Sequence, residues 1–358
     1  MYCGIDSAPC APAPDHGPIS SGRGPGEARP RGVVSAEAAG GHAPVLVKEV
    51  LELFGQNQVA GARHYLDCTF GGGGHTRVLL EADPAARVTA LDRDPAAGRR
   101  AAELAARYGG RFRFCDLPFS RIGELTEAGY AGVLFDLGVS SFQLDEAERG
   151  FSFRHAAAAD MRLDPRTGVP AAEFLESASR EELVAAVRDA GEEMRWRRVV
   201  EAIIRARGTG RLGRTDTLAE LVADAVGNPP GRPQRLHPAT RTFQGLRITL
   251  NEELIELEAA LPWAVEKLAP GGVLAVISFH SLEDRIVKRF FNRLAGRPEH
   301  ENDSTPAQFR EVRADLLTRR PLVAAEAEAS ANPRSRSAKL RAVRKLGQPL
   351  NPKLSPKS

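Results

Sequence analysis

The chain has 358 residues, enough for one large α/β domain and a second structural unit. Apolar residues make up 42% and charged residues 27%, which is typical of a protein with a sizeable core and excludes a fibre or a fully disordered chain. The net charge of +3 is too small by itself to indicate a nucleic-acid partner. The four cysteines lack CxxC spacing, so we predict no disulfide framework and no metal site.

The first forty residues consist mainly of Ala, Gly and Pro, with almost no large apolar side chain. Such a segment cannot bury enough surface to offset the entropy of ordering, so we predict a disordered extension over 1–40. The chain start has neither the basic nor the apolar region of a secretory signal, and no apolar run approaches the ~18 residues of a membrane span. We therefore predict a cytoplasmic protein with no membrane partner.

Short apolar runs alternate with helical stretches between residues 65 and 137, which predicts a parallel sheet with helices on both faces. The predicted strands are 65–70, 88–91, 112–115 and 133–137, and the predicted helices are 76–82, 95–108 and 121–128. After Gly138 the pattern becomes helical, with no convincing strand. Ser179 and Glu182 form a capping box there, and Thr215 begins another helix. We predict an inserted all-helical domain over 145–236.

The closing part returns to the alternating pattern. Apolar residues at spacings of three and four between Phe243 and Leu261 predict one long helix. A buried strand over 271–279 and a helix over 282–294 follow, and two short runs, 321–324 and 340–346, are expected to close the sheet as an antiparallel hairpin. The predicted fold is a doubly wound, mostly parallel α/β sheet, built from 41–144 and 237–347, with a tail over 348–358.

A glycine-rich turn follows the first predicted strand, where Asp67 precedes Gly71 to Gly74. Ligands of open parallel sheets bind at the carboxyl ends of the strands, and glycines let the backbone approach them closely. The dinucleotide fingerprint fails because Thr76 or Arg77 stands where its third glycine would be. Asp67 would repel a pyrophosphate but suits the ammonium group of a methionine moiety. The turn therefore favours S-adenosylmethionine over a dinucleotide.

Two further residues support an adenosine-containing ligand. Asp92 ends the second predicted strand, where a carboxylate can accept hydrogen bonds from ribose hydroxyls. Phe119 follows the third strand and could stack on adenine, although a single Phe is more often a core residue. Neither residue defines the reaction.

Several longer motifs occur in order along the chain. They are His42-Ala-Pro-Val-Leu, Gly73-Gly-His75, Asp136-Leu-Gly-Val-Ser-Ser141, Asp160-Met-Arg162, His237-Pro-Ala-Thr-Arg241, Ser278-Phe-His280 and Asn332-Pro-Arg-Ser-Arg-Ser. Through them the chain closely resembles the bacterial RsmH (MraW) family over residues 42–346. The resemblance implies a class I S-adenosylmethionine-dependent methyltransferase with a helical insert that helps to hold RNA. It also implies that the substrate is N4 of a decoding-region cytidine in 16S ribosomal RNA, free or in the small ribosomal subunit.

The resemblance also implies which residues contact the methyl donor. They are Gly73, Gly74, His75, Asp92, Phe119, Asp136 and Gln143. The cytosine amine is a poor nucleophile, so an acceptor for its N–H and in-line placement should matter most. We hypothesise that Asp136, or the backbone near Leu137 and Gly138, supplies this acceptor. A general base at His75 or His280 is a weaker alternative, because the amine can lose its proton to water after transfer.

Arginines dominate the predicted insert. Eleven arginines and no lysine lie between residues 195 and 247, although a solvated helix face is an equally good explanation for them. Arg241, Arg247 and Arg285 could bind phosphate or pair with buried carboxylates such as Glu283 or Asp284. His280 could contact RNA or order the loop after the fifth strand.

Gly245 departs from the family pattern, which often has Ala at this position, and costs the predicted helix about 1 kcal/mol of propensity. Two alternatives to the implied activity remain open. One is a non-catalytic RNA-binding assembly factor, which would have no reason to keep an intact donor site. The other is a DNA cytosine-N4 methyltransferase, which the missing Asp-Pro-Pro-aromatic motif disfavours. The oligomeric state cannot be predicted.

Overall fold

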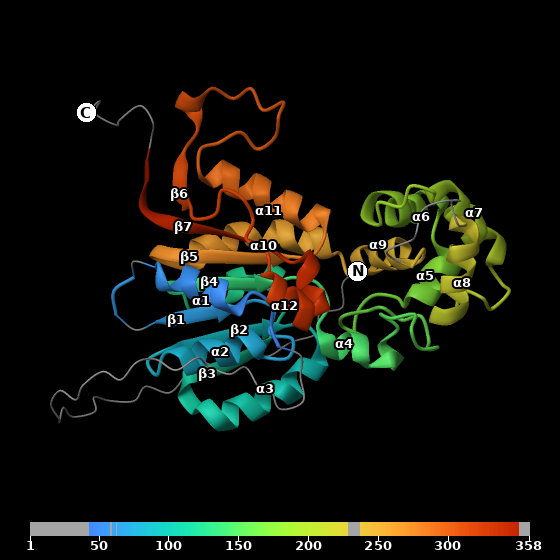
Figure 1. The fold of residues 1–358 in the computed structure, drawn as a ribbon, viewed down its shortest axis with the longest axis horizontal. Coiled ribbons are helices and arrows are strands. Elements are labelled where there is room, and N and C mark those ends of the chain that lie inside the picture. The colour runs from blue at the N-terminus through green and yellow to red at the C-terminus, as the bar shows by residue number, and fades with distance from the viewer. Residues whose placement is uncertain (1–42, 58, 62, 228–236, 351–358) are drawn as a thin grey trace.

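The computed structural model describes residues 43–57, 59–61, 63–227 and 237–350. The predicted extension over 1–40 and most of the predicted tail lie outside these residues. A sheet of seven strands has helices on both faces, and further helices form a lobe beside it (Figure 1). Among the described residues, no helix is both long and apolar enough to cross a membrane.

The strands of the sheet are β1 (His64–Asp67), β2 (Arg87–Asp92), β3 (Phe112–Asp116), β4 (Tyr130–Asp136), β5 (Leu268–Ser278), β6 (Val312–Leu316) and β7 (Lys339–Leu350). Their order is β3-β2-β1-β4-β5-β7-β6. Strands β1 to β5 are parallel, whereas β7 runs antiparallel to both β5 and β6. The predicted fold class, a mostly parallel, doubly wound sheet with an antiparallel C-terminal pair, is confirmed.

One strand of the predicted C-terminal hairpin is wrong. The partner of β7 is β6, whereas the run 321–324 contributes only an isolated bridge between Leu322 and Leu340. Leu322 exchanges both backbone hydrogen bonds with Leu340, but the pairing does not extend to the following residues.

Two apolar cores lie on the two faces of the sheet. One face packs against α1 (Val47–Gly55), α2 (Gly74–Ala82) and α3 (Pro95–Tyr108), and the other against α10 (Glu253–Lys267) and α11 (Ser281–Leu294). Helix α3 has the predicted bounds, because Asp94 caps its first turn by accepting from the Ala96 N–H and Pro95 occupies its first position. The helix predicted over 121–128 is wrong: Phe119–Glu124 forms a 3-10 turn, η2, packed against Trp263 of α10.

The long helix predicted from Phe243 to Leu261 is also wrong, because it is two helices. Helix α9 (Thr240–Leu250) ends at Asn251, and α10 begins after Glu252, whose backbone is left-handed with φ 52°. The Asn251 side chain accepts from the Leu163 N–H at 2.7 Å and donates to the Met161 carbonyl at 2.8 Å. The apolar spacing continues through the break, so it could not reveal these bonds.

Helices that follow β4 and precede α9 form the lobe beside the sheet (Figure 1). They include α4 (Ser141–Asp145), α5 (Ala171–Ser177), α6 (Arg180–Val184), the π-helical turn η4 (Ala185–Ala190), α7 (Trp196–Ala206) and α8 (Thr215–Val226). The capping box at Ser179 and Glu182 and the start of α8 at Thr215 are confirmed. A third apolar core joins α5 to α8 with α9. Helix α9 therefore packs with the lobe, although it follows the predicted boundary at 236. The predicted domain bounds remain a proposal.

Candidate active site

A cavity of about 530 Å³ opens where the carboxyl ends of β1, β2, β4 and β5 meet the helical lobe. Its wall contains most of the residues predicted to bind the donor or the RNA. Those are Gly74, His75, Asp92, Phe119, Asp136, Gln143, Arg247 and His280. Asp67, Gly73, Arg241 and Arg285 do not line it. The sheet topology thus brings together side chains that lie up to about two hundred residues apart in the sequence.

The glycine-rich turn after β1 is shaped by contacts within the protein. Gly71 and Gly73 have positive φ values of 53° and 73°, which side chains rarely adopt. A Cβ atom on Gly72 would overlap the Phe142 ring, and one on Gly74 would lie 3.1 Å from Pro44. The turn therefore presents bare backbone to the cavity and begins α2 beside it.

Asp67 has a structural role behind this turn. Its buried carboxylate accepts hydrogen bonds from the Thr76 hydroxyl at 2.7 Å and the Thr69 N–H at 3.2 Å. Burial raises the pKa of Asp67, and the bond from Thr76 opposes this shift. Because Asp67 is buried and does not line the cavity, it fits the ammonium-binding role predicted for it less well than Asp136 does.

Asp92 lies in the cavity wall at the end of β2. It accepts hydrogen bonds from the Gly71 N–H at 2.7 Å and the Asp94 N–H at 2.9 Å. Burial raises its pKa to about 6, although the two N–H donors favour the charged form. Phe119, also in the wall, packs edge-to-face on Phe135 with ring centroids 5.6 Å apart. A carboxylate and an aromatic ring thus face the same cavity.

His75 and Asp136 form the charged centre of the cavity. The Nε2 atom of His75 lies 3.5 Å from Oδ2 of Asp136. Burial opposes protonation of His75, but Asp136 and Asp67 outweigh it and raise the pKa of His75. The other carboxylate oxygen of Asp136, Oδ1, is buried and has no hydrogen-bond partner among the described residues. Asp136, a residue of the cavity wall, therefore has one carboxylate oxygen without a donor among the described residues.

Gln143 connects the cavity to the entrance of the helical lobe. Its amide donates to Asp94 at 2.9 Å, while its oxygen accepts from the Ser140 N–H and completes a capping box for α4. Arg149 binds the same Asp94 carboxylate at 3.0 Å and also donates to the carbonyls of Arg162 and Leu163. A change in the lobe can therefore alter the cavity wall through this network.

Arg247 and His280 lie on the other side of the cavity, and both are held by carboxylates. Arg247 makes two bonds of 2.8 Å to Glu253. The His280 ring caps α11 at the Glu283 N–H and lies 3.1 Å from the Glu283 carboxylate. His280 thus orders the loop after β5, as one of its two predicted roles required, and Arg247 pairs with Glu253 rather than with Glu283 or Asp284.

The ligand atoms of Glu253, His280 and Glu283 lie within 4.8 Å of one another, close enough to hold a metal ion. Arg247 already supplies a positive charge there, because it binds Glu253 and acts electrostatically on Glu283. Within the described residues, Arg247 thus supplies these carboxylates with a cationic partner, and the prediction of no metal site stays a prediction.

Arg241 and Arg285 lie outside the cavity and meet at Glu192. Arg241 donates to the Glu192 carbonyl at 3.1 Å, and the Arg285 guanidinium lies 3.4 Å from its carboxylate. Both arginines are exposed. Their predicted RNA contacts remain predictions.

Sequence reasoning assigned no role to Arg334, although it quoted the motif that contains it. The structure places Arg334 in the cavity wall, where it donates to the Val139 carbonyl at 2.9 Å and to the Ser141 hydroxyl. Burial lowers the pKa of Arg334, and Asp136 acts in the opposite direction. The arginine in the motif Asn332-Pro-Arg334 could have indicated a role in the site. Because this motif lies far from the other motifs in the sequence, its place in the cavity wall could not be predicted.

The sheet order, the glycine-rich turn after β1 and the carboxylate at the end of β2 define a class I methyltransferase that uses S-adenosylmethionine. The cavity fits this donor: Asp92 offers acceptors for ribose hydroxyls, Phe119 offers an aromatic face, and Asp136 has an unused acceptor.

The chain belongs to the MraW methylase family, whose model matches residues 39–346. It is 46% identical over 315 residues to ribosomal RNA small subunit methyltransferase H of Methylobacterium nodulans, covering 86% of this chain and 91% of that protein. With the protein of the same name from Thermomicrobium roseum it shares 45% identity over 317 residues, 85% and 94% of the two chains. A solved rRNA methylase of Streptococcus thermophilus is 9% identical, with a TM-score of 0.37 over 84% of this chain and 95% of that one.

Proposed function

We propose that this methyltransferase transfers a methyl group from S-adenosylmethionine to N4 of a decoding-region cytidine in 16S ribosomal RNA. The names of its relatives support a small-subunit ribosomal RNA substrate, which would place the activity in the cytoplasm. The observation that carries the amine as acceptor is the unpartnered Oδ1 of Asp136 in the cavity wall, because a carboxylate oxygen can accept a hydrogen bond from an exocyclic N–H.

The donor would be held by residues from the first half of the sheet. Asp92 would bind its ribose, Phe119 its adenine, and the backbone of Gly74 and the side chains of His75 and Gln143 would complete the wall. The bound donor supplies a methyl group on a sulfonium centre, which is a good leaving system. The protein therefore needs no nucleophile of its own, and its contribution is to position the acceptor.

Positioning the amine would depend on Asp136. The cytosine amine is weakly nucleophilic because its lone pair is conjugated with the ring. A hydrogen bond from one amine hydrogen to Oδ1 would orient this lone pair and stabilise the positive charge that develops on nitrogen. Asp136 raises the pKa of His75, whose Nε2 lies 3.5 Å from Oδ2, so the ring and the carboxylate stabilise each other at the acceptor position. After transfer, the proton can leave to water.

The target base would have to leave the RNA stack to enter a cavity of about 530 Å³. His280 and Arg247, on the side of the cavity away from the glycine turn, would contact the nucleotide or its phosphate. Because carboxylates already hold both side chains, they would act as fixed groups rather than as mobile ones.

The test is to incubate the full chain and labelled donor with unmethylated small subunits, with naked 16S RNA and with DNA, and to map any modified nucleotide by mass spectrometry. We expect N4-methylcytidine in 16S RNA. Label in DNA alone would establish the DNA methyltransferase alternative. RNA binding without label in any substrate would establish the assembly factor.

A further inference from the structure

A row of exposed arginines lies on the helical lobe, outside the cavity. Helix α7 buries Val199, Val200 and Ile203 in the lobe core, so its other face points to solvent. Arg198 and Arg205, seven residues apart, lie on one stripe of that face, and Arg197 is next to it. The stripe is about 10 Å long. The arginines of the predicted insert are therefore concentrated on one surface.

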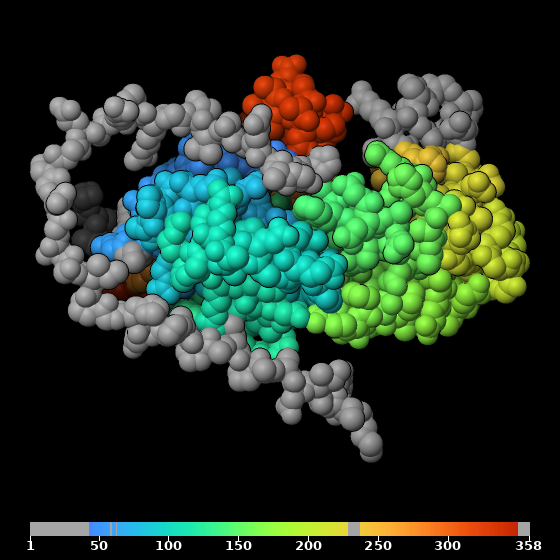
Figure 2. All heavy atoms as spheres, turned by 90° about the horizontal axis from the view of Figure 1, so that it is seen from below, coloured from blue at the N-terminus to red at the C-terminus, as the bar shows by residue number. Residues whose placement is uncertain are grey.

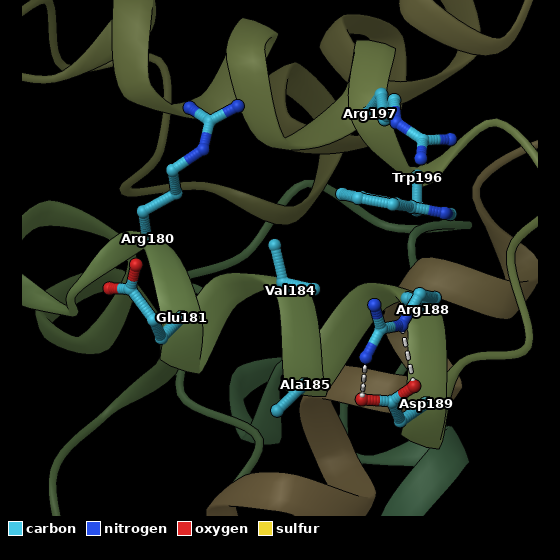
Figure 3. Close-up of a pocket in the computed structure, with 8 residues that line it drawn as sticks. All are labelled: Arg180, Glu181, Val184, Ala185, Arg188, Asp189, Trp196 and Arg197. Carbon is cyan, nitrogen blue, oxygen red and sulfur yellow. Dashed lines mark hydrogen bonds and ion pairs between the residues drawn. The ribbon is translucent and has the colours of Figure 1, made fainter.

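Two hollows adjoin this stripe. One, between α7 and α8, has a volume of about 720 Å³ and is lined by Arg197, Arg198, Arg205 and Arg211. The other, between α6 and α7, has a volume of about 400 Å³ and is lined by Arg188, Trp196 and Arg197 (Figure 3). Arg197 lines both hollows, so they are adjacent. We call Arg197, Arg198, Arg205 and Arg211 with Trp196 the arginine groove.

The guanidinium groups of the arginine groove are not neutralised within the described chain. The side chains of Arg197, Arg198, Arg205 and Arg211 make no hydrogen bond or ion pair with the described residues, unlike Arg188, which binds Asp189 at 2.7 Å. The carboxylates in the hollow are Glu201, which pairs with Arg180, and Asp224. Unpaired like charges in one hollow repel one another, and a polyanion would relieve that repulsion.

Trp196 fixes one of these cations in place. The Arg197 guanidinium stacks on its indole ring at 4.3 Å, and Arg188 lies on the opposite side of the ring at 5.4 Å (Figure 3). With both ring faces covered, Trp196 is not free to stack on a base. Its effect is to hold Arg197 with its N–H donors directed to solvent, which suits phosphate better than it suits a base.

The chain segment that leads into the arginine groove is bonded at Glu192 to residues next to the cavity. His280 lines the cavity and begins α11, and the next residue, Ser281, donates to Glu192. Arg241 and Arg285 contact the same Glu192, which precedes Trp196 by four residues. Figure 2 shows that the surface of the lobe continues that of the sheet domain. A strand with its target base in the cavity could follow these residues to the groove.

We propose that the arginine groove binds the phosphate backbone of ribosomal RNA next to the target nucleotide, as a second RNA surface separate from the cavity. This inference rests on the proposed function for the identity of the RNA. Phosphate suits the groove because all of its unpaired cations are arginines, whose planar donors can bind a phosphate group through two hydrogen bonds. An acidic protein is the alternative partner, which the test below distinguishes.

The test compares two double variants that each remove two exposed, unpaired arginines. Arg198→Gln with Arg205→Gln changes the groove, and Arg99→Gln with Arg289→Gln changes α3 and α11. We expect the groove variant to raise KM for small subunits at least about tenfold, to leave kcat and donor affinity unchanged, and to reduce the salt dependence of 16S RNA binding by about two in log–log slope. The control should match the wild type.

RNA affinity is measured without donor, so the groove is tested even if no methyl group is transferred. A groove variant with wild-type affinity and salt slope would overturn the inference. So would weakened binding to assembled subunits with unchanged binding to naked 16S RNA, because the partner would then be a subunit protein. Lost RNA affinity in the variant, together with no methylation of RNA by the wild type, would refute the proposed function and leave the groove established.

Discussion

The Cβ position of Gly245 on α9 lies 2.6 Å from the backbone nitrogen of Gly191, at the end of the π-helical turn η4, and overlaps the Ala186 carbonyl oxygen. The two glycines therefore let α9 and η4 meet backbone to backbone. Gly245→Ala, which helix propensity alone would favour, should lower the free energy of unfolding by about 1–3 kcal/mol, because backbone atoms must move to admit the methyl group. Urea denaturation measures the change.

Gly98→Ala is the matched control for this substitution. Gly98 also lies within a helix, α3, but its Cβ position is 3.7 Å from the Phe114 ring, an ordinary contact. We expect a gain of about 0.5–1 kcal/mol from helix propensity. If both variants were stabilised alike, the close contact at Gly245 would have no energetic effect.

Arg149→Lys should weaken both the fold and donor binding. A lysine cannot reproduce the fork that joins Asp94 to the carbonyls of Arg162 and Leu163, so buried acceptors would lose their donors. We expect a loss of about 2–4 kcal/mol in unfolding free energy and a higher donor Kd, measured by denaturation and calorimetric titration. Arg154→Lys, exposed and close in sequence, should change neither quantity.

Asp136→Asn should reduce kcat by a factor of about 100 or more at saturating donor and RNA. The substitution preserves shape but replaces one acceptor oxygen with a donor, so the amine would lose its partner. Rapid-quench turnover measures kcat, and equilibrium dialysis measures donor affinity separately. Glu148→Gln changes an exposed residue of the segment that follows β4, and this variant should keep the wild-type rate. A normal kcat for Asp136→Asn would show that Asp136 does not accept from the amine.

The stability of the fold should depend on His64 in mild acid. His64 lies against the Tyr130 ring and bonds to the Thr89 hydroxyl at 2.9 Å, and burial lowers its pKa from 6.5 to about 4. A depressed histidine pKa gives stability that is present above pH 6.5 and is lost as the pH falls towards 4. Unfolding free energies at pH 7 and pH 4.5 should therefore differ more for the wild type than for His64→Gln, by up to about 3 kcal/mol. Equal differences would show that His64 is not buried in its neutral form.

Much of the fold could be predicted because its signals are local. Apolar runs located β1 to β5, and Pro95 fixed the start of α3 at the correct residue. The errors arose where distant residues decide the structure. The break after α9 depends on bonds from Asn251 to residues of the lobe entrance, and the apolar spacing across that break gives no sign of them.

The site shows the same limit. Residues at strand ends, such as Asp92 and Asp136, could be identified because parallel strands deliver their carboxyl ends to one edge. The role of Asp67 could not be read in this way, because only the fold shows that Thr76 turns back to use its carboxylate. The position of Arg334 depends on the C-terminal segment crossing over the cavity, which no local pattern encodes.

The first described residues meet the segment before β7 beside the active site. The Leu46 N–H donates to the Glu328 carboxylate at 2.8 Å, Asn332 donates to the Ala43 carbonyl at 3.1 Å, and β7, the last strand, lies between β5 and β6. A nascent chain thus cannot complete the cavity or the sheet until nearly all of it has left the ribosome that makes it. A chain terminated before this segment would lack the contacts that complete the cavity. The enzyme can therefore become active only after its own synthesis is almost complete.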